Sequence, residues 1–572
     1  MTNETTAARS NAAEPEPDSL SDQAARNTLA LNPLIGLRVN DLMDSAQILL
    51  KAIVNEPMAA GGQWLSFLGE LGRIGAGQSD RVQQSGDKRF ADATWKNSWA
   101  HRRLLQAYLA GGEALNGFID KTSLGELDKA RARLIANIII DAASPTNILM
   151  SNPAAVRQFL DTGGESLWRG FKNYLTDLAE NGGLPAQVDK SRFKLGVNIA
   201  TTPGAVVYKN ELLEVIQYKP ETPEVRKRPL VVTPPQINKF YSNDLSPDKS
   251  LVQYLVKSGI QVFCVSWRNP TAKERDWGLD TYVAALDEGT DAVREITSSD
   301  DVTMMGACSG GITSAAYVGR LARKGEAKVK NIVSPVCVLD TASTGDSAFG
   351  PLATPETLRA AKEASRLRGV LDGQDLGRMF AWMRPNDLIW NYWVNNYLMG
   401  NQPPAFDILF WNADTTSLPA RLHHDYIDMY FTNPFVNANK LTLDGAAIDM
   451  SRVKLDAYVV AGVTDHITPW KAVYHTAKIY GDNTTFILSN SGHLQSLLNP
   501  PTNPKASFAA GTAEARDGDA FMSTGEKRNG SWWPHWRDWL FERSGAEVPP
   551  PAKLGSDRQP AGAAAPGTYV FQ

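Results

Sequence analysis

The chain has 572 residues, of which 43% are hydrophobic and 21% charged, and its formal net charge is −4. This is the composition of a globular protein large enough for two or three domains, and it lacks the basic excess of a nucleic-acid-binding protein. Its three cysteines, Cys264, Cys308 and Cys337, cannot form a disulfide framework and favour a reducing compartment. Residues 1–20 lack the basic start and apolar core of a signal peptide, and no apolar run has the roughly 18 residues of a membrane-spanning helix. We therefore expect a cytoplasmic protein.

The N-terminal third is predicted to be helical after a disordered tail. Residues 1–30 are poor in large apolar side chains and are expected to be disordered. In residues 31–200 apolar side chains recur three and four positions apart, as in DLMDSAQILLKAIV, which predicts a helical domain. One helix is expected to begin at Ser123, whose spacing to Glu126 is that of a capping box. The apolar faces of these helices either pack as a bundle or dock on another subunit or a lipid-like surface.

Short apolar runs rich in β-branched residues begin near residue 200. PGAVVYKN, LEVIQYK, RPLVVTPP, QVFCVSW and DVTMMGA alternate with helix-like segments such as TYVAALDEGTDAVREI. Strands that alternate with helices indicate βαβ units and a parallel sheet covered on both faces. Residues 201–572 are therefore assigned to an α/β catalytic domain. Within it, residues 341–450 lack an obvious strand and are dense in Trp, Tyr and Phe, which predicts a cap insertion over an active site.

Cys308 is the predicted nucleophile. It is the central residue of GACSG (306–310), between a predicted strand and a predicted helix. This is the context of the G-x-S-x-G nucleophile elbow of α/β hydrolases, with Cys in place of Ser, and the helix N-terminus favours a thiolate. The backbone N–H groups of Ser309 and of Ile237, in the loop after RPLVVTPP, are the candidate donors of an oxyanion hole. Two alternatives remain: Cys308 is a buried structural thiol, or Ser309 is the nucleophile. Cys264 is predicted to be a core residue.

Asp465 and His493 are the predicted acid and histidine of the triad. In α/β hydrolases the order along the chain is nucleophile, acid, histidine. LDAYVVAGVTD ends at Asp465 and TTFILSNSGH ends at His493, each just past the carboxyl end of a predicted strand. The nearest competitor, His466, adjoins the acid in sequence. The alternative for Asp465 is an N-cap of the helix expected near Pro469.

No metal or cofactor is expected. Metal-ligand spacings such as H-E-x-x-H or CxxC are absent from the sequence, as are Walker and dinucleotide fingerprints. A cysteine nucleophile instead favours acyl transfer from a thioester, because exchange between thioesters is nearly balanced in energy. An aromatic cap that keeps water out would allow an alcohol to accept the acyl group.

Long segments of the chain match one family of acyl-transfer enzymes. They include NPLIGLR, DKRFADATW, SNPAAVRQFLDTGG, PPQINKFY, VSWRNPT, GACSGG, MRPNDLIWNYWVNNYL, GVTDHITPW, SGHLQS and PAGAAAPGTYV. The chain resembles the polyhydroxyalkanoate synthases on these segments, and most closely the medium-chain-length (class II) type. The resemblance covers all but about the first 30 residues.

The resemblance implies that the chain polymerises (R)-3-hydroxyacyl-CoA and releases CoA. Cys308 matches the acylated cysteine and His493 the general base, while Asp465 matches an acid that either orients His493 or activates the incoming 3-hydroxyl. The family also implies an α/β-hydrolase fold with a helical N-terminal domain, a mobile cap, a homodimer and residence on polymer granules in the cytoplasm. CoA is then part of the substrate and no separate cofactor is needed.

Three further residues are candidates for the substrate pocket. Arg384 could contact a CoA phosphate or hold the cap by a salt bridge. Gln495 lies two residues past His493, and Cys337 stands where members of the resembled family commonly carry Ser or Thr, which leaves monomer size open. Two groups of aromatic residues have alternative roles. One group either forms the core of the cap or lines an acyl tunnel: Trp382, Trp390, Trp393 and Tyr397. The other either packs inside the protein or anchors it on a granule: Trp532, Trp533, Trp536 and Trp539.

Two competing functions remain at this point. A cysteine-dependent thioesterase or lactone hydrolase of the same fold would release hydroxyacid and form no polymer. A non-enzymatic granule-coat protein would keep the fold without the activity, although an intact elbow, acid and histidine argue against it.

Overall fold

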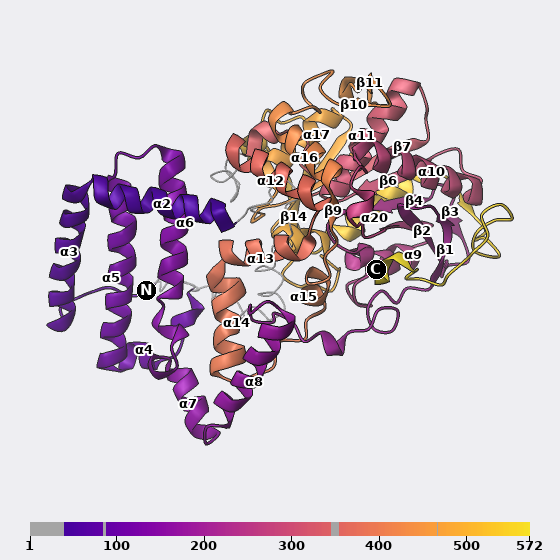
Figure 1. Cartoon of the computed structure of the whole chain (residues 1–572). Helices are drawn as coiled ribbons and strands as arrows, with labels where there is room; N and C mark the ends of the chain where they lie inside the picture. Colours follow the sequence, from indigo (N-terminus) through magenta and orange to yellow (C-terminus); the bar gives the residue numbers. More distant parts are fainter. Residues whose placement is uncertain (1–38, 84–86, 345–353, 466) are drawn as a thin grey trace, which may run out of the picture.

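The computed structural model describes residues 39–83, 87–344, 354–465 and 467–572 (Figure 1). The predicted disordered tail, residues 1–30, lies outside these residues. Figure 1 shows a helical N-terminal part beside a larger part that is built around a sheet. Within the described chain, no helix has the length and apolar character needed to cross a membrane.

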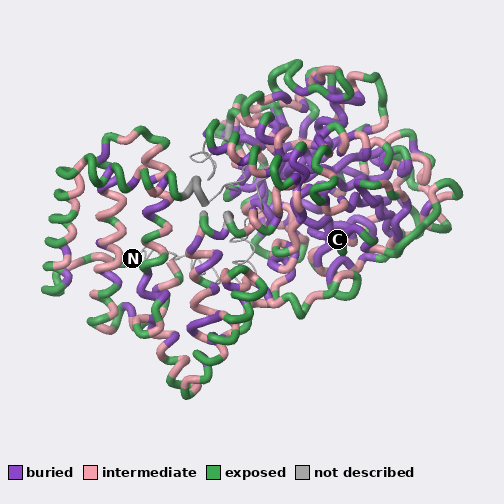
Figure 2. The backbone as a smooth tube through the Cα atoms, in the orientation of Figure 1, coloured by how far each residue is buried: buried purple, intermediate pink, exposed green. Residues whose placement is uncertain are grey.

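The N-terminal part is helical, in agreement with the spacing of its apolar side chains. Its helices are α2 (Val39–Asn55), α3 (Pro57–Gly75), α4 (Thr94–Asn97), α5 (Trp99–Lys121), α6 (Glu126–Ala142), α7 (Pro153–Asp161) and α8 (Glu165–Glu180). A small core lies between α2, α5 and α6 and consists of Leu49, Ala52, Phe118, Ile119, Ala132, Ile135 and Ala136. Many other residues of these helices are exposed or half-buried, as Figure 2 shows. The helices thus pack as a bundle and still present apolar side chains outward.

The predicted capping box at Ser123 is wrong. Helix α6 begins at Glu126, and its N-cap is Gly125. The backbone N–H and the hydroxyl of Ser123 both donate to Oε1 of Glu56, at 2.9 and 2.8 Å. Ser123 therefore donates across the bundle to a charged acceptor at the junction of α2 and α3, and it does not cap its own helix.

A ten-stranded sheet with the order β1-β2-β5-β4-β6-β7-β12-β13-β14-β15 organises the larger part. The six strands from β5 to β13 in this order are parallel neighbours. Most of their residues are buried, as expected of strands with both faces covered. Their bounds are β4 (Leu230–Thr233), β5 (Val262–Trp267), β6 (Val302–Gly306), β7 (Val329–Pro335), β12 (Asp456–Gly462) and β13 (Thr484–Ser489).

The prediction of a parallel sheet is wrong at both edges. Strands β1 (Gly204–Lys209) and β2 (Leu213–Tyr218) form an antiparallel pair. The link between them is too short for the crossover connection that parallel strands need. β2 is also antiparallel to β5. At the other edge, β14 (Ser507–Thr512) and β15 (Glu526–Asn529) are antiparallel strands that the sequence did not reveal. SFAAGT has only one aromatic and one β-branched residue among small ones, and EKRN has neither, so the side chains by which strands are predicted are scarce here.

Helices α9 (Leu251–Val256), α10 (Leu279–Thr297), α11 (Ser309–Lys324), α17 (Trp470–Tyr480) and α20 (Trp533–Arg543) accompany the sheet. α10 and α11 contact each other, and α17 packs on β12 and β13. The main core of the molecule lies between these helices and the strands, where Figure 2 shows the densest burial.

The cap insertion (residues 341–450) lies between β7 and β12. Its main helical segments are α12 (Pro355–Arg368), α13 (Gly373–Met383), η9 (Asn386–Trp390), α14 (Asn391–Trp393), η10 (Val394–Leu398), α15 (Asp407–Asn412) and α16 (Ala420–Thr432). The short ladders β8 (Val370–Leu371) with β9 (Leu418–Pro419), and β10 (Thr442–Leu443) with β11 (Ala446–Ala447), complete it.

The aromatic segment of the cap insertion contacts the N-terminal helices. The indole of Trp393 donates to the carbonyl of Asn147 at 3.1 Å, and the hydroxyl of Tyr397 donates to Asp177 of α8 at 2.8 Å. Figure 1 shows α14 beside α8 accordingly. Trp390 packs edge-on against Trp393, whereas Trp382 is 36% exposed. Trp393 and Tyr397 thus join the cap insertion to the bundle, a role that neither alternative for them included.

Candidate active site

Cys308 occupies a tight turn between β6 and α11. Its backbone has φ 49° and ψ −121°, a conformation that non-glycine residues rarely adopt outside functional turns. The turn requires small neighbours. A Cβ on Gly306 would lie 2.5 Å from Oγ of Ser314, and one on Gly310 would lie 2.2 Å from the carbonyl oxygen of Thr233. The strand–turn–helix geometry that the GACSG pattern predicted is therefore present.

His493 and Asp465 lie together, each just past the carboxyl end of a strand. His493 begins the short helix α18 (His493–Leu497) after β13, and Asp465 follows β12. Their side chains meet at 2.7 Å, between Nδ1 of His493 and Oδ2 of Asp465. Asp465 is 6% exposed and His493 4%. The two residues that the sequence placed past the ends of late strands are thus brought into contact.

The alternative of Asp465 as a helix N-cap is wrong. Helix α17 starts at Trp470 with Pro469 as its N-cap. Oδ1 of Asp465 accepts from the backbone N–H groups of Ile467 and Thr468, both at 2.9 Å, before that helix begins. These bonds fix the carboxylate so that Oδ2 faces His493.

Thr468 is a site residue that the sequence did not reveal. Its hydroxyl lies 2.6 Å from Oδ2 of Asp465 and 3.1 Å from Nδ1 of His493. The signal was available as an Asp followed three positions later by Thr, a spacing at which the Asp side chain binds backbone N–H groups within its own turn. Thr468 therefore adds a third group that fixes the side chains of Asp465 and His493 relative to each other.

Electrostatics join Cys308 to this pair. Burial by itself would lower the pKa of His493, but the charge and hydrogen bond of Asp465, together with the hydrogen bond and charge of Cys308, raise that pKa to about 10. Burial opposes ionisation of Asp465 as well, yet His493 and Thr468 lower the pKa of Asp465. Since Nδ1 of His493 is occupied by Asp465, Nε2 is the nitrogen left for the thiol. The three groups form a buried chain of carboxylate, imidazolium and sulfur.

The candidate oxyanion donors lie on two elements that touch. Ile237 is in the loop after β4 and Ser309 begins α11, and both are buried. Within the described part of the chain, neither backbone N–H donates a hydrogen bond to a protein acceptor. The hydroxyl of Ser309 accepts from the backbone N–H of Gln236 at 3.4 Å. Ser309 thus helps to hold the loop, which favours Cys308 over Ser309 as the nucleophile.

The other candidates for the substrate pocket lie in different surroundings. Cys337 is fully buried against the elbow helix, where its Sγ would lie 2.6 Å from a Cβ on Gly311, and burial raises its thiol pKa well above the ordinary range. Gln495 is half-buried in α18. Arg384 forms an ion pair with Asp387, three residues along the chain, which supports the salt-bridge alternative. Cys264 is fully buried within β5, as predicted.

The four tryptophans of residues 532–539 form a cluster that packs against α18. Trp532, Trp533 and Trp536 are at most 1% exposed and Trp539 is 6% exposed. The indole of Trp532 donates to the carbonyl of Ser496 at 2.7 Å. That of Trp533 donates to the carbonyl of Leu497 at 3.2 Å. The packing alternative is confirmed, and the cluster supports the helix that carries His493.

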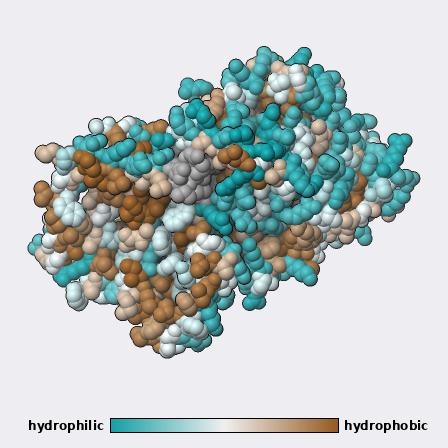
Figure 3. All heavy atoms as spheres, viewed as in Figure 1, coloured by the Kyte–Doolittle hydropathy of each residue, from teal (hydrophilic) through white to brown (hydrophobic). Residues whose placement is uncertain are grey.

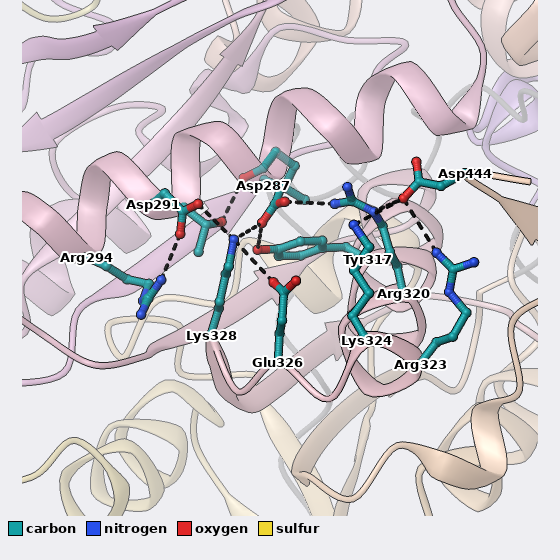
Figure 4. Close-up of polar contacts among 12 residues, drawn as sticks. Asp287, Asp291, Arg294, Tyr317, Arg320, Arg323, Lys324, Glu326, Lys328 and Asp444 are labelled. Atoms are coloured by element: carbon teal, nitrogen blue, oxygen red, sulfur yellow. Dashed lines mark hydrogen bonds and ion pairs between the residues drawn. The ribbon is translucent and has the colours of Figure 1, made fainter. Parts of the chain in front are cut away.

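A charged network holds the far half of the elbow helix (Figure 4). Asp287 of α10 accepts from Tyr317 and Arg320 of α11, both at 2.8 Å, and from Lys328 at 2.7 Å. Arg320 also donates to Asp444, between β10 and β11, at 2.6 Å. The network thus ties α11 to α10 on one side and to the cap insertion on the other. Among the described residues no cluster of three or more potential metal ligands is found.

Two family models match the chain. "Poly-beta-hydroxybutyrate polymerase (PhaC) N-terminus" matches residues 86–255, and "alpha/beta hydrolase fold" matches residues 229–500. The chain is 49% identical to Poly(3-hydroxyalkanoate) polymerase 1 of Ectopseudomonas oleovorans, over 97% of this chain and 99% of that protein. Polymerase 2 of the same organism is 47% identical, over 94% and 96%. The poly(3-hydroxyalkanoate) polymerase subunit PhaC of Cupriavidus necator is 36% identical, over 86% and 84%.

Proposed function

Because this chain belongs to the poly(3-hydroxyalkanoate) polymerase family, and is an acyltransferase of that kind, we propose that it polymerises (R)-3-hydroxyacyl groups through an acyl-cysteine on Cys308. The acyl donor is a CoA thioester, and free CoA is the second product. The single observation that carries the mechanism is the buried contact of Cys308, His493 and Asp465 at the elbow. A separate cofactor has no part in the proposal, since CoA enters with the substrate.

In the loading step, sulfur of Cys308 attacks the thioester carbonyl. The carbonyl oxygen becomes an oxyanion that the N–H groups of Ile237 and Ser309 stabilise. As the bond from carbon to the CoA sulfur breaks, the imidazolium of His493 gives its proton to the departing CoA thiolate. The step leaves acyl-Cys308, free CoA and a neutral imidazole, and no oxidant or further reactant is needed.

In the elongation step, the neutral imidazole of His493 accepts the proton of a 3-hydroxyl as that oxygen attacks the acyl-cysteine. An ester bond forms, the carbon–sulfur bond breaks, and Cys308 is free to be loaded again. Asp465 serves to orient His493 in this scheme. Its oxygens already accept hydrogen bonds from Ile467, Thr468 and His493, and its lowered pKa makes it a weak base for a hydroxyl.

Burial of the site supports polymerisation over hydrolysis. Cys308 is 9% exposed and its two partners less, so water has little access to an acyl-cysteine. The competing thioesterase would need an open path for water to this bond.

A homodimer and residence on granules are part of the proposal. Apolar side chains stand exposed on the N-terminal helices, among them Trp64, Leu65, Trp99, Trp168 and Leu178. Figure 3 shows hydrophobic surface concentrated over this part of the molecule. Exposed apolar surface of this kind is typical of contact with another protein or an apolar phase. A polyester granule and a second subunit both offer such a surface.

The test is CoA release from (R)-3-hydroxybutyryl-CoA and (R)-3-hydroxydecanoyl-CoA, with sizing of the products. We expect insoluble polyester from the wild type and none from Cys308→Ala. CoA release with free hydroxyacid alone would show a thioesterase and refute polymerisation. Equal activity of Cys308→Ala would refute the acyl-cysteine. The two substrates also rank the monomer lengths that the pocket accepts.

A further inference from the structure

Thr416, in the cap insertion, holds the peptide group that would supply one of the two oxyanion donors. Its hydroxyl donates to the carbonyl oxygen of Gln236. Its backbone N–H donates to the carbonyl oxygen of Ile237 at 2.9 Å. Two successive carbonyls of the loop after β4 are therefore gripped by one residue, and all three residues are at most 3% exposed.

The geometry of a peptide group gives this grip a consequence. The carbonyl of Gln236 and the N–H of Ile237 belong to the same peptide unit. A trans peptide is planar, so its C=O and N–H point in opposite directions, and this bond is not among the cis bonds of the described chain. Fixing the carbonyl of Gln236 on the cap side therefore fixes the N–H of Ile237 on the other side. Without the Thr416 hydroxyl, the peptide plane could rotate and turn the donor away.

The side chain of Gln236 holds the same loop from a second direction. Its Nε2 donates to Oγ1 of Thr313 in the elbow helix at 2.7 Å, and its Oε1 accepts from the hydroxyl of Tyr426 in α16 at 3.0 Å. Gln236 and both of these partners are at most 2% exposed. The loop is thus bonded at once to the helix that carries Cys308 and to the cap insertion. Among the described residues, the Thr416 hydroxyl is the group that bonds the carbonyl of the 236–237 peptide itself.

We propose that Thr416 is a positioning residue for acyl transfer, because its hydroxyl orients the Ile237 N–H toward the oxyanion that forms at Cys308. The cap insertion then does more than cover the site, since it supplies a part of the oxyanion machinery. This inference rests on the proposed acylation of Cys308. It assigns to Thr416 an effect on the rate of acylation and none on the reactivity of the sulfur.

The test compares Thr416→Val with the wild type in the full-length protein. Valine keeps the β-branched shape and the backbone N–H and removes only the hydroxyl. Removal of one oxyanion donor typically costs 10²- to 10³-fold in rate, and a donor that is misaligned for part of the time should cost about 10- to 100-fold. We expect this loss in the first-turnover rate of CoA release at saturating (R)-3-hydroxyacyl-CoA, with the half-saturating concentration changed less than about threefold.

Three controls separate positioning from a merely structural role. Thr416→Ser keeps the hydroxyl and should restore most of the rate. Thr415→Val makes the same change at the adjacent position, where no side-chain hydrogen bond is found within the described chain, and should leave the rate unchanged. Alkylation of Cys308 by iodoacetamide develops no oxyanion, so its rate should stay within about twofold of wild type in every variant.

A normal CoA-release rate in Thr416→Val would overturn the proposal, as would a parallel loss of alkylation or a failure of Thr416→Ser to restore the rate. The failure of the proposed function gives a different result. A wild type that releases CoA but forms only hydroxyacid refutes polymerisation and leaves the Thr416 comparison valid, because loading precedes both fates. A wild type whose Cys308 is alkylated but that releases no CoA refutes both.

Discussion

Asp465→Asn tests the electrostatic account of the site most directly. The carboxylate of Asp465 is the main group that favours the charged form of His493, whose pKa stands at about 10 against an ordinary value of 6.5. This difference of about 3.5 pH units corresponds to about 5 kcal/mol of preference for the imidazolium. Asparagine is nearly isosteric but carries no charge, so most of this preference should disappear. The pKa of His493 should then fall toward or below 6.5, because its burial remains.

The assay is the pH dependence of first-turnover CoA release. In the proposed loading step the imidazolium donates a proton, so the rate should fall as pH rises through the pKa of His493. The wild type should keep its rate to about pH 10, whereas the variant should lose it near or below neutrality. The maximal rate should also drop by about 10²- to 10⁴-fold, since the histidine loses its oriented tautomer. An unchanged alkaline limb in Asp465→Asn would refute the reasoning.

The same shifts predict how stability depends on pH. The pKa of His493 is raised in the fold, so its contribution is complete below about 6.5 and is lost as pH rises through about 10. The pKa of Asp465 is lowered, so its contribution is present at neutral pH and is lost as pH falls through the acidic range. Asp465→Asn should therefore lower the melting temperature at pH 7 and bring the wild type and the variant closer together at acidic pH.

Three further predictions test other parts of the structure. Burial lowers the pKa of His423 to about 3, so the fold should lose up to about 5 kcal/mol between pH 6.5 and 3, and His423→Leu should lessen this loss in thermal melts at pH 7 and pH 4. Asp287→Asn weakens a half-buried hub and should cost about 2–3 kcal/mol in urea unfolding, whereas Asp444→Asn, at a more exposed site, should cost about 1 or less; equal costs would contradict the burial argument. Gly310→Ala places a methyl 2.2 Å from the Thr233 carbonyl and should lower CoA release at least about tenfold, while a wild-type rate would show that the turn can relax.

Features with a local cause could be predicted from the sequence. The parallel strands were visible because they are continuous apolar runs, and Cys308, Asp465 and His493 because each stands at a sheet edge in a fixed chain order. The elbow adds its own signal, since a Cβ on Gly306 would meet Gly310 and Ser314 of the same turn and helix. The family resemblance reached the same triad by a separate route.

Features that depend on distant contacts could not be predicted. Tyr426 and Gln236 are 190 residues apart, and nothing in either segment indicates that they share a hydrogen bond. Ser123 has the spacing of a capping box, but its hydroxyl donates to the carboxylate of Glu56, 67 residues away between α2 and α3. The edge strands β14 and β15 are strands because a neighbour supplies hydrogen bonds, and their own side chains do not favour that structure. At Ser123 and in the edge strands, tertiary contacts override the local sequence preference.

The contacts of the cap insertion give a physical reason why an acyl-cysteine at this site would react with a hydroxyl more often than with water. This insertion contacts the N-terminal bundle through Tyr397 and Asp177, and it contacts the loop of the proposed oxyanion hole through Thr416. If it moved far enough to admit bulk water, it would also withdraw the group that orients the Ile237 N–H. Water access and full catalytic geometry are then mutually exclusive in this arrangement. An open site would be a poor hydrolase, and a closed site would transfer the acyl group only to an acceptor already inside, which is the selectivity that chain growth requires.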